Sequence, residues 1–323
     1  MNILVTGGAG FIGSHIVKHH LAKGNVVWAV DNLQAGHLKN IETIKHLPTF
    51  QFYQSDVRSW PELLKAVSWA DHIYHMAGNV GQYLILSNPI DTLTNNIEAL
   101  EAVLKAMATT KTKARLIIAS TSELYCHSVE EEDRTVVENA VISFIPGNFL
   151  QETYPVSKLT NEIMALSYIH QKGIHCTIAR IFNTIGVNQS PAYGMVVPTF
   201  IQQASSGKTM TIFGDGLQTR SFSDARDTAT ALNLLLDNAE SNGMVVNVGN
   251  DTECSINDLA KLIRAKTNSK SEFKYIPYVE AYGIDFVDVK RRCPNLKKLK
   301  KLTNFTSKWT LEQTIEEILK TAK

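Results

Sequence analysis

A tyrosine and a lysine four residues apart are the clearest candidates for acid–base chemistry in this sequence. Tyr154 and Lys158 occur in the run Tyr-Pro-Val-Ser-Lys, which we predict to open a helix that presents both side chains on one face. A nearby ammonium group stabilises a phenolate and lowers the pKa of the phenol, so Tyr154 could accept a proton near neutral pH. Thr121, at the end of an apolar strand, could hold a substrate oxygen between them. Together these residues predict removal of a hydroxyl proton while the carbon that bears it is oxidised.

A glycine-rich turn near the N-terminus predicts a site for the diphosphate of a dinucleotide. The predicted strand Ile3–Val5 runs into Gly7, Gly10 and Gly13, and the predicted helix Phe11–Lys23 follows. Glycine allows the tight turn, lets backbone N–H groups approach a pyrophosphate, and lets the helix pack close to the strand. The N-terminus of the helix adds unpaired N–H groups and a partial positive charge, which favour an anion.

An acidic residue at the end of the second predicted strand indicates which dinucleotide is bound. The strand Val26–Val30 runs directly into Asp31, which lies 18 residues beyond Gly13. A carboxylate at this place accepts hydrogen bonds from the ribose hydroxyl groups of adenosine and repels a 2′-phosphate. The sequence therefore predicts NAD rather than NADP as the cofactor.

These residues need a parallel sheet that brings the ends of its strands together. Apolar runs rich in β-branched residues alternate with helix-length segments through residue 183, as is typical of βαβ units. We therefore predict an α/β protein with a Rossmann-type doubly wound parallel sheet and a smaller C-terminal substrate-binding lobe. The NAD-binding domain would comprise residues 1–183 and about 222–250, and the lobe residues 184–221 and 251–323. The expected strands are Ile3–Val5, Val26–Val30, Phe50–Tyr53, His72–His75, Arg115–Ala119, His175–Ile181 and, after a return from the lobe, Val245–Val248.

The overall composition argues against several classes of function. Lys and Arg number 32 and Asp and Glu 31, so the net charge of +1 attracts neither nucleic acid nor a membrane surface. The four cysteines form no CxxC pair and no zinc spacing, so we expect reduced thiols, no metal and a cytoplasmic protein. No apolar run approaches the ~18 residues of a membrane span. We interpret the lysines at 297, 298, 300 and 301 as a solvated helix face.

With its motifs in this order, the sequence resembles the extended short-chain dehydrogenase/reductases, and among them the nucleotide-sugar epimerases, dehydratases and decarboxylases. The resemblance covers essentially the whole chain, and it implies transient oxidation of a nucleotide-linked sugar at C4 with NAD. The residues that carry it are Thr6–Gly13, Asp56-Val57, His75–Gly78, Asn96, Thr121, Tyr154 with Lys158, Arg180–Asn183, Val196–Pro198, Gly214–Arg220 and Arg291–Pro294.

The resemblance also implies a role for each matching residue. Catalysis would involve Thr121, Ser122, Glu123, Tyr154 and Lys158. NAD would be bound by Gly7, Gly10, Phe11, Ile12, Gly13, Asp31, Asn32, Asp56, Val57, Ala77, Asn96, Tyr154 and Lys158. The nucleotide sugar would be bound by Asn183, Val197, Arg220 and Arg292, where a guanidinium suits a diphosphate because it donates two parallel hydrogen bonds. A homodimer is implied as well, through helices at Ile97–Ala108 and Ser157–Gln171.

The residues after Thr121 bear on the net reaction. Hexose 4,6-dehydratases usually carry Asp-Glu there, whereas Ser122-Glu123 is similar to the UDP-glucuronic acid decarboxylases, as is the stretch Tyr282–Val289. This resemblance favours decarboxylation of a UDP-sugar such as UDP-glucuronic acid. Cys126 stands where the family usually has glycine, and residues 81–84 depart from the decarboxylase pattern. A UDP-hexose or UDP-uronate 4-epimerase, an NDP-hexose 4,6-dehydratase and a catalytically silent NAD-binding regulator therefore stay open as alternatives.

Overall fold

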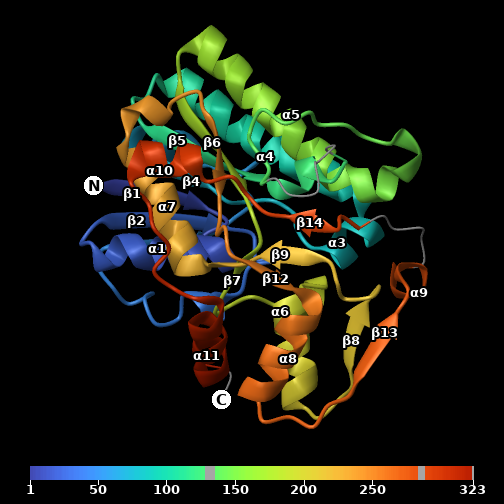
Figure 1. Cartoon of the computed structure of the whole chain (residues 1–323). Coiled ribbons are helices and arrows are strands. Elements are labelled where there is room, and N and C mark those ends of the chain that lie inside the picture. The colour runs from blue at the N-terminus through green and yellow to red at the C-terminus, as the bar shows by residue number, and fades with distance from the viewer. Residues whose placement is uncertain (128–134, 283–287, 322–323) are drawn as a thin grey trace.

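A parallel sheet forms the centre of the computed structural model, which describes residues 1–127, 135–282 and 288–321 (Figure 1). The sheet has seven strands in the order β11-β6-β5-β4-β1-β2-β3, and every neighbouring pair runs parallel. Each strand contains a predicted apolar run, so the predicted sheet is confirmed, including the late return of the chain. The strands are β1 (Asn2–Thr6), β2 (Val26–Asp31), β3 (Phe50–Gln54), β4 (His72–His75), β5 (Arg115–Thr121), β6 (His175–Ile181) and β11 (Val245–Val248).

Helices cover both faces of this sheet, which makes the fold doubly wound as predicted. One face carries α1 (Phe11–Ala22), α7 (Ala225–Asp237) and α10 (Lys297–Thr303), and the other carries α2 (Leu63–Trp69), α4 (Pro89–Thr110) and α5 (Phe149–Lys172). Two buried apolar clusters, one on each face, join these helices to the strands. Because each strand is covered twice, its side chains are apolar on both sides, and the alternation typical of exposed sheets is absent from the sequence.

A third apolar cluster lies below the carboxyl ends of the strands, at the bottom of Figure 1. It joins α6 (Val196–Ser205), α8 (Ile256–Lys266) and α11 (Leu311–Thr321) to the parallel pair β8 (Met210–Phe213) and β13 (Phe273–Ile276). Beside it, β9 (Thr219–Ser221) pairs with β12 (Glu253–Ser255) and β14 (Arg291–Arg292). The two-stranded sheet of β7 (Thr184–Ile185) and β10 (Ser223–Asp224) and the short helices α3 (Gln82–Ser87) and α9 (Tyr278–Tyr282) complete the region. The predicted boundary between two domains stays a prediction. That boundary assigns Leu296, Leu299 and Phe305 to the lobe, but in the structure these residues pack into the core that contains α1 and α7.

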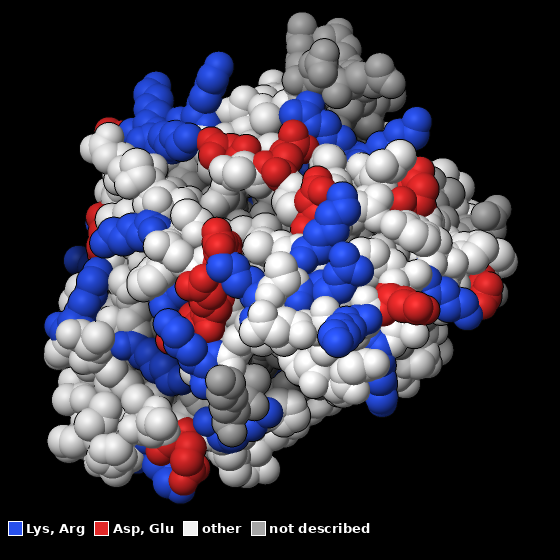
Figure 2. All heavy atoms as spheres, turned by 60° about the horizontal axis from the view of Figure 1, so that its bottom comes forward, with Lys and Arg blue, Asp and Glu red and all other residues white. Residues whose placement is uncertain are grey.

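Two details of the helices bear on the sequence predictions. The helix that carries Tyr154 begins at Phe149 rather than at the tyrosine, and Pro155 lies inside it. The prediction of its start was wrong because a proline is more often found in the first turn of a helix. Lysines 297, 300 and 301 are exposed on α10, and Figure 2 shows acidic and basic side chains interspersed over the face in view. Among the described helices, none combines the length and the apolar character that crossing a bilayer requires.

Candidate active site

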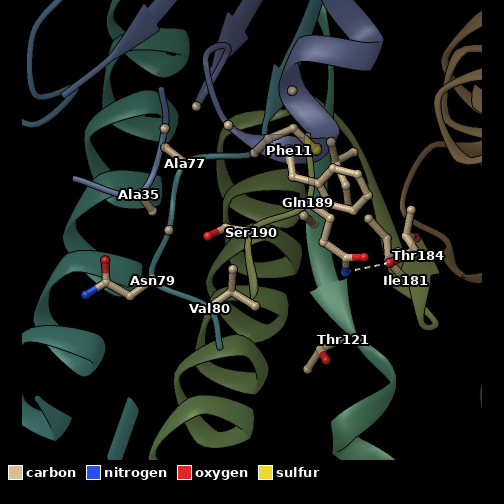
Figure 3. A pocket seen from close by; sticks show the side chains of 18 of the residues that line it. Phe11, Ala35, Ala77, Asn79, Val80, Thr121, Ile181, Thr184, Gln189 and Ser190 are labelled. Carbon is tan, nitrogen blue, oxygen red and sulfur yellow. Dashed lines mark hydrogen bonds between the residues drawn. The ribbon is translucent and has the colours of Figure 1, made fainter. Parts of the chain in front are cut away.

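The carboxyl ends of the central strands surround a cavity of about 340 Å³. Turns that follow β1, β2, β4, β5 and β6 line it, together with α5, α6 and β14. Figure 3 shows Ala35 and Thr121 on opposite sides of this cavity, so it reaches from the turn after β2 to the end of β5. Every predicted site residue lines it except Asn96 and Arg220. A parallel sheet binds its ligands at this edge because the strand ends and the helix N-termini meet there.

The glycine-rich turn between β1 and α1 leaves no room for side chains. A Cβ atom on Gly13 would lie 2.0 Å from the carbonyl oxygen of Gly7, and one on Gly7 would lie 2.7 Å from the nitrogen of Ala77. Gly7 also has a φ of +71°, a backbone conformation that side chains rarely adopt. The first turn of α1 follows directly and lines the cavity. This cradle fits the pyrophosphate of NAD, which helix N-termini bind through backbone N–H groups.

Asp31 forms the wall of the cavity at the end of β2. Its carboxylate accepts hydrogen bonds from the backbone N–H groups of Ala9 at 3.0 Å and Leu33 at 2.8 Å. A Cβ atom on Gly36 would lie 2.7 Å from the carboxylate oxygens, so the loop after β2 closes tightly over Asp31. Burial raises the pKa of Asp31, and the two backbone donors oppose this rise. A buried acid in this wall fits the ribose hydroxyl groups of NAD and disfavours a 2′-phosphate.

Asp56, which the family resemblance places at the adenine, is held by an arginine. Arg58 donates to it from Nε at 2.9 Å and from Nη2 at 2.7 Å, and Asn32 adds a longer hydrogen bond of 3.3 Å. The hydrogen bonds from Arg58 lower the pKa of Asp56 to about 2, so it is a carboxylate at neutral pH. Arg58 was not predicted as a site residue, although its position two residues after Asp56 could have indicated it.

Asn96 lies behind the cavity lining and holds part of it in place. Its amide oxygen accepts a hydrogen bond from the backbone N–H of Asn79 at 2.7 Å, and its amide nitrogen donates to Ser157 at 3.0 Å. The backbone after β4 is thereby fixed to α5, and a Cβ atom on Gly78 would lie 2.8 Å from the amide oxygen. Asn96 thus shapes the wall near Ala77, and its direct contact with NAD stays a prediction.

Tyr154 and Lys158 lie one helical turn apart on α5, where the helix passes the end of β5. The ammonium group of Lys158 donates to the carbonyl oxygen of Ala119 at 3.0 Å and lies 5.8 Å from the centre of the Tyr154 ring. Thr121 lines the same cavity, and its side chain lowers the pKa of the Tyr154 phenol. The structure therefore brings the three predicted residues together in the cavity, as a group that can take a proton from a substrate hydroxyl and return it.

The predicted lowering of the tyrosine pKa is wrong for this structure. Burial raises the pKa of Tyr154 far above its usual range and the nearby Glu123 raises it further, whereas the side chain of Thr121 lowers it. The ammonium group of Lys158 is directed at a backbone carbonyl, and burial lowers the pKa of this lysine to about 8. Desolvation thus outweighs the attraction that the sequence argument relied on. The positive nicotinamide ring of NAD would add the charge that favours a phenolate.

The turn after β5 and the strand β14 meet at the end of the cavity where the family resemblance places the sugar, called here the sugar end. Glu123, in the short helix η2 (Ser122–Tyr125), lines the cavity together with Ser122 and Arg292. Arg292 donates to the amide oxygen of Asn183 at 3.1 Å and to the sulfur of Cys126 at 3.8 Å. Its Nε is buried and finds no partner among the described residues. Burial raises the pKa of Glu123, which the charge of Arg292 opposes. A carboxyl group that can hold a proton thus shares the cavity with a guanidinium that can receive an anion.

Arg220 is next to Arg292 across the paired strands β9 and β14, but it does not line the cavity. Its Nη2 donates to a carboxylate oxygen of Asp288 at 2.5 Å, and the hydroxyl of Tyr278 donates to the other oxygen at 2.6 Å. The guanidinium is therefore engaged by an acid, and its contact with a diphosphate stays a prediction. Asp288 belongs to the decarboxylase-like stretch Tyr282–Val289, of which residues 283–287 lie outside the described part of the chain.

Several lining residues were not predicted from the sequence. The segment after β7 contributes Asn188, Gln189 and Ser190 to the cavity. Figure 3 shows the side chain of Gln189 hydrogen-bonded to the carbonyl oxygen of Thr184, at 3.1 Å. Glycine and proline crowd this part of the sequence, which indicated turns but not the direction in which the turns face. The turns face the glycine-rich loop because Asn188 donates to Ser14 of α1, at 3.2 Å.

The fold and the cavity together define an NAD-binding enzyme in which a tyrosine, a lysine and a threonine meet at the end of a parallel strand. The chain belongs to the NAD dependent epimerase/dehydratase family, whose sequence model matches residues 3–249. The predicted family, the NAD cofactor and the activity of a nucleotide-sugar-modifying enzyme are thereby confirmed. The alternative of a catalytically silent NAD-binding regulator is set aside, since the family to which the chain belongs is a family of enzymes.

Characterised relatives modify sugar acids linked to UDP. The chain is 31% identical to a UDP-N-acetyl-alpha-D-glucosaminuronate decarboxylase from Bacillus cytotoxicus, over 98% of this chain and 96% of the relative. It is 32% identical to UDP-glucuronic acid decarboxylase 1 from Danio rerio, over 98% of this chain and 71% of the relative. Among solved structures, UDP-glucuronic acid 4-epimerase from Bacillus cereus, in complex with UDP-glucuronic acid and NAD, matches with a TM-score of 0.87 at 26% identity, over 100% of both chains.

Proposed function

We propose that this protein oxidises a UDP-linked sugar acid at C4 and releases its carboxyl group as CO2. The observation that carries the proposal is that Glu123 and Arg292 line the same cavity as Thr121 and Tyr154, close enough for the charge of Arg292 to act on the pKa of Glu123. A simple 4-epimerase needs the tyrosine, the threonine and the lysine but no additional acid. Relatives at about 30% identity over nearly the whole chain, named UDP-glucuronic acid decarboxylases and a UDP-N-acetyl-alpha-D-glucosaminuronate decarboxylase, support the choice of a sugar acid.

The first half of the reaction uses the residues at the end of β5. NAD, when bound, supplies the reversible oxidation and reduction of the sugar at C4. Tyr154 takes the proton of the C4 hydroxyl, while Thr121 holds the oxygen through its own hydroxyl. Lys158 stabilises the phenolate that forms and, with the turn at Gly7, holds the cofactor beside the sugar. The same tyrosine returns the proton when C4 is reduced again, so the group acts twice in each turnover.

The second half of the reaction needs less help from the protein. With a ketone at C4, the acid at C5 is a β-keto acid, so the bond to the carboxyl carbon breaks readily and its electron pair moves toward the C4 oxygen. CO2 leaves, and C5 takes up a proton. Glu123, whose pKa is raised by burial, is placed to donate that proton. Arg292 binds the anionic part of the substrate through the donor that finds no partner in the described structure.

A second function is favoured by one specific comparison. The structure matches the UDP-glucuronic acid 4-epimerase of Bacillus cereus over its full length, so the same substrate could be oxidised and then reduced from its other face. In that reaction the carboxyl group stays, and Glu123 would only orient its neighbours. A dehydratase is the weaker alternative here, because the turn has Ser122 where the hexose dehydratases usually have an acid.

Product mass separates these reactions directly. Purified protein is incubated with NAD and either UDP-glucuronic acid or UDP-N-acetylglucosaminuronic acid, and the sugar nucleotides are followed by mass spectrometry. Loss of CO2 supports the proposal, whereas an unchanged mass at a new retention time would establish the epimerase. Loss of water from an NDP-hexose would place the enzyme among the dehydratases. Tyr154→Phe is the control, because it should bind NAD normally and convert none of these substrates.

We propose that the active form is a homodimer that pairs α4 and α5 of two chains. Ile90, Ile163 and Leu166 on these helices are exposed in the single chain, at 76%, 57% and 39% of their surface. Apolar side chains on neighbouring helices fit a bundle between two copies. Light scattering should report a dimer for the wild type and a monomer for Ile163→Glu, and a wild-type monomer would contradict the proposal.

A further inference from the structure

A buried ionic network lies behind the catalytic end of the cavity. Glu162, one turn after Lys158 on α5, accepts a hydrogen bond of 2.5 Å from the hydroxyl of Ser120. Arg180 of β6 donates to both oxygens of the same carboxylate, from Nε at 2.8 Å and from Nη2 at 2.7 Å. All three residues are at least 96% buried, so the ion pair is well removed from water. Glu162 therefore ties the end of β5 to α5 and to β6.

The network continues from Arg180 to the turn that carries Glu123. Nη1 of Arg180 donates to the hydroxyl of Tyr125 at 2.8 Å, and that hydroxyl donates to the amide oxygen of Asn247 in β11 at 2.8 Å. Tyr125 is 1% exposed, and burial raises the pKa of its phenol to about 12, so it remains a donor at neutral pH. The last residue of η2 is thereby fixed to two strands of the central sheet.

Three members of the network are close in sequence to residues of the catalytic group. Ser120 precedes Thr121, Tyr125 follows Glu123 by two residues, and Glu162 follows Lys158 by four. Glu162, Arg180 and Tyr125 themselves lie behind the residues that line the cavity. A buried carboxylate with a guanidinium on both of its oxygens has few alternative arrangements, because any shift would leave a charge or donor unpaired away from water.

We infer that Glu162, Arg180 and Tyr125 are positioning residues that hold Thr121, Glu123 and Lys158 in register for the reaction. None of them touches the substrate under this assignment. They would act on turnover by fixing the distance between the sugar oxygen and the acid–base group. A displacement of about 1 Å in such a group lowers turnover by roughly 100-fold. The inference depends on the proposed function only through the choice of substrate for the assay.

Tyr125→Phe tests the inference because it removes one hydroxyl and keeps the ring. We expect kcat to fall by roughly tenfold or more, while KM and the affinity for NAD change less than about twofold. The matched control is Tyr74→Phe in β4, another fully buried tyrosine whose hydroxyl bonds to His20 at 2.8 Å and to Asn233 at 3.4 Å. Tyr74 lies on the side of the sheet away from the catalytic group. The Tyr74→Phe variant should lose about as much unfolding free energy as Tyr125→Phe, but its kcat should equal that of the wild type.

Equal kcat values for Tyr125→Phe and Tyr74→Phe would overturn the inference, since the network would then only stabilise the fold. A second variant, Arg180→Lys, keeps the charge but cannot donate to both oxygens of Glu162 and to Tyr125 together. It should lower kcat more than Tyr125→Phe, and circular dichroism establishes that the variants are folded. Reduction of NAD in a single turnover is the readout, and it reports the same first step for a decarboxylase and an epimerase. If the wild type gives a product without loss of CO2, the proposed reaction fails while this comparison of variants still holds.

Discussion

The two ends of the cavity differ in the groups that surround them. At the cofactor end the turn after β1 is packed so tightly around Gly7 and Gly13 that no Cβ atom fits. At the other end the charged side chains of Glu123 and Arg292 line the cavity, and behind them Arg220 is already engaged by Asp288, at 2.5 Å. We therefore expect the cofactor end to be preformed by the path of the chain, whereas a substrate that binds Arg220 would have to replace its contact with Asp288. This difference suits a cofactor that stays and a substrate that enters and leaves.

The largest expected effect comes from placing a side chain in the tightly packed turn between β1 and α1. Gly13→Ala would put a Cβ atom 2.0 Å from the carbonyl oxygen of Gly7, and the turn must open to accept it. We expect the affinity for NAD to fall by roughly 1,000-fold, because the helix N-terminus loses its place beneath the pyrophosphate. Titration of NAD by calorimetry measures this. Gly147→Ala is the matched control, since nothing lies within 4 Å of its Cβ, and it should bind NAD as the wild type does.

The same contrast explains which parts of the site the sequence could predict. The turn at Gly7 and the pair Tyr154 and Lys158 depend on spacing within one segment, and the structure has them where the spacing indicated. The engagement of Arg220 by Asp288 joins residues 68 positions apart, and no local pattern carries that information. The central sheet was predictable because strands covered on both faces are apolar throughout. The start of α5 was not, because five helical residues before Tyr154 have no distinctive periodicity.

Acidic pH should lower the free energy of unfolding, because a neutral histidine is buried next to the turns that form the cofactor end of the cavity. His75, at the end of β4, hydrogen-bonds to Thr6 at 2.9 Å, and burial lowers its pKa to about 3. Below about pH 6.5, the pKa of this histidine in the unfolded chain, His75 binds a proton in the unfolded chain but not in the folded one. The stability that is present above that pH is therefore lost as the pH falls. Between pH 7 and pH 5 this histidine should cost about 2 kcal/mol of unfolding free energy. Urea unfolding at both pH values measures the slope.

His75→Gln provides the control for the acid effect, since glutamine can keep the hydrogen bond to Thr6 and does not titrate. Its unfolding free energy should fall less between pH 7 and pH 5 than that of the wild type. Equal slopes for the two proteins would show that His75 is not the group that takes up the proton. His20, whose pKa burial lowers to about 3, contributes in the same direction and keeps the slope of the variant above zero.

A smaller effect is expected from Asp31, an acid that lines the cofactor end of the cavity. Asp31→Ala removes the acceptor of the ribose hydroxyl groups and the charge that repels a 2′-phosphate. The affinity for NAD should fall by roughly tenfold, while the affinity for NADP should fall less or rise. Measuring both dissociation constants gives the ratio directly. An unchanged ratio of the two dissociation constants would remove Asp31 from the nucleotide site.

The smallest expected effect is a change in the affinity for UDP when Asp288 is replaced. Whether the affinity rises or falls tells whether the substrate has to displace Asp288 from Arg220 at the sugar end. Asp288→Asn keeps the shape of the side chain and removes the charge that engages Arg220 and accepts from Tyr278. If a substrate diphosphate must displace this carboxylate, the variant should bind UDP a few-fold more tightly, while its unfolding free energy falls because a buried guanidinium lacks its counter-charge. Arg220→Ala should change UDP affinity in the opposite direction. Weaker binding of UDP by Asp288→Asn would mean that the acid holds Arg220 ready for the substrate, and the sugar end would then be as preformed as the cofactor end.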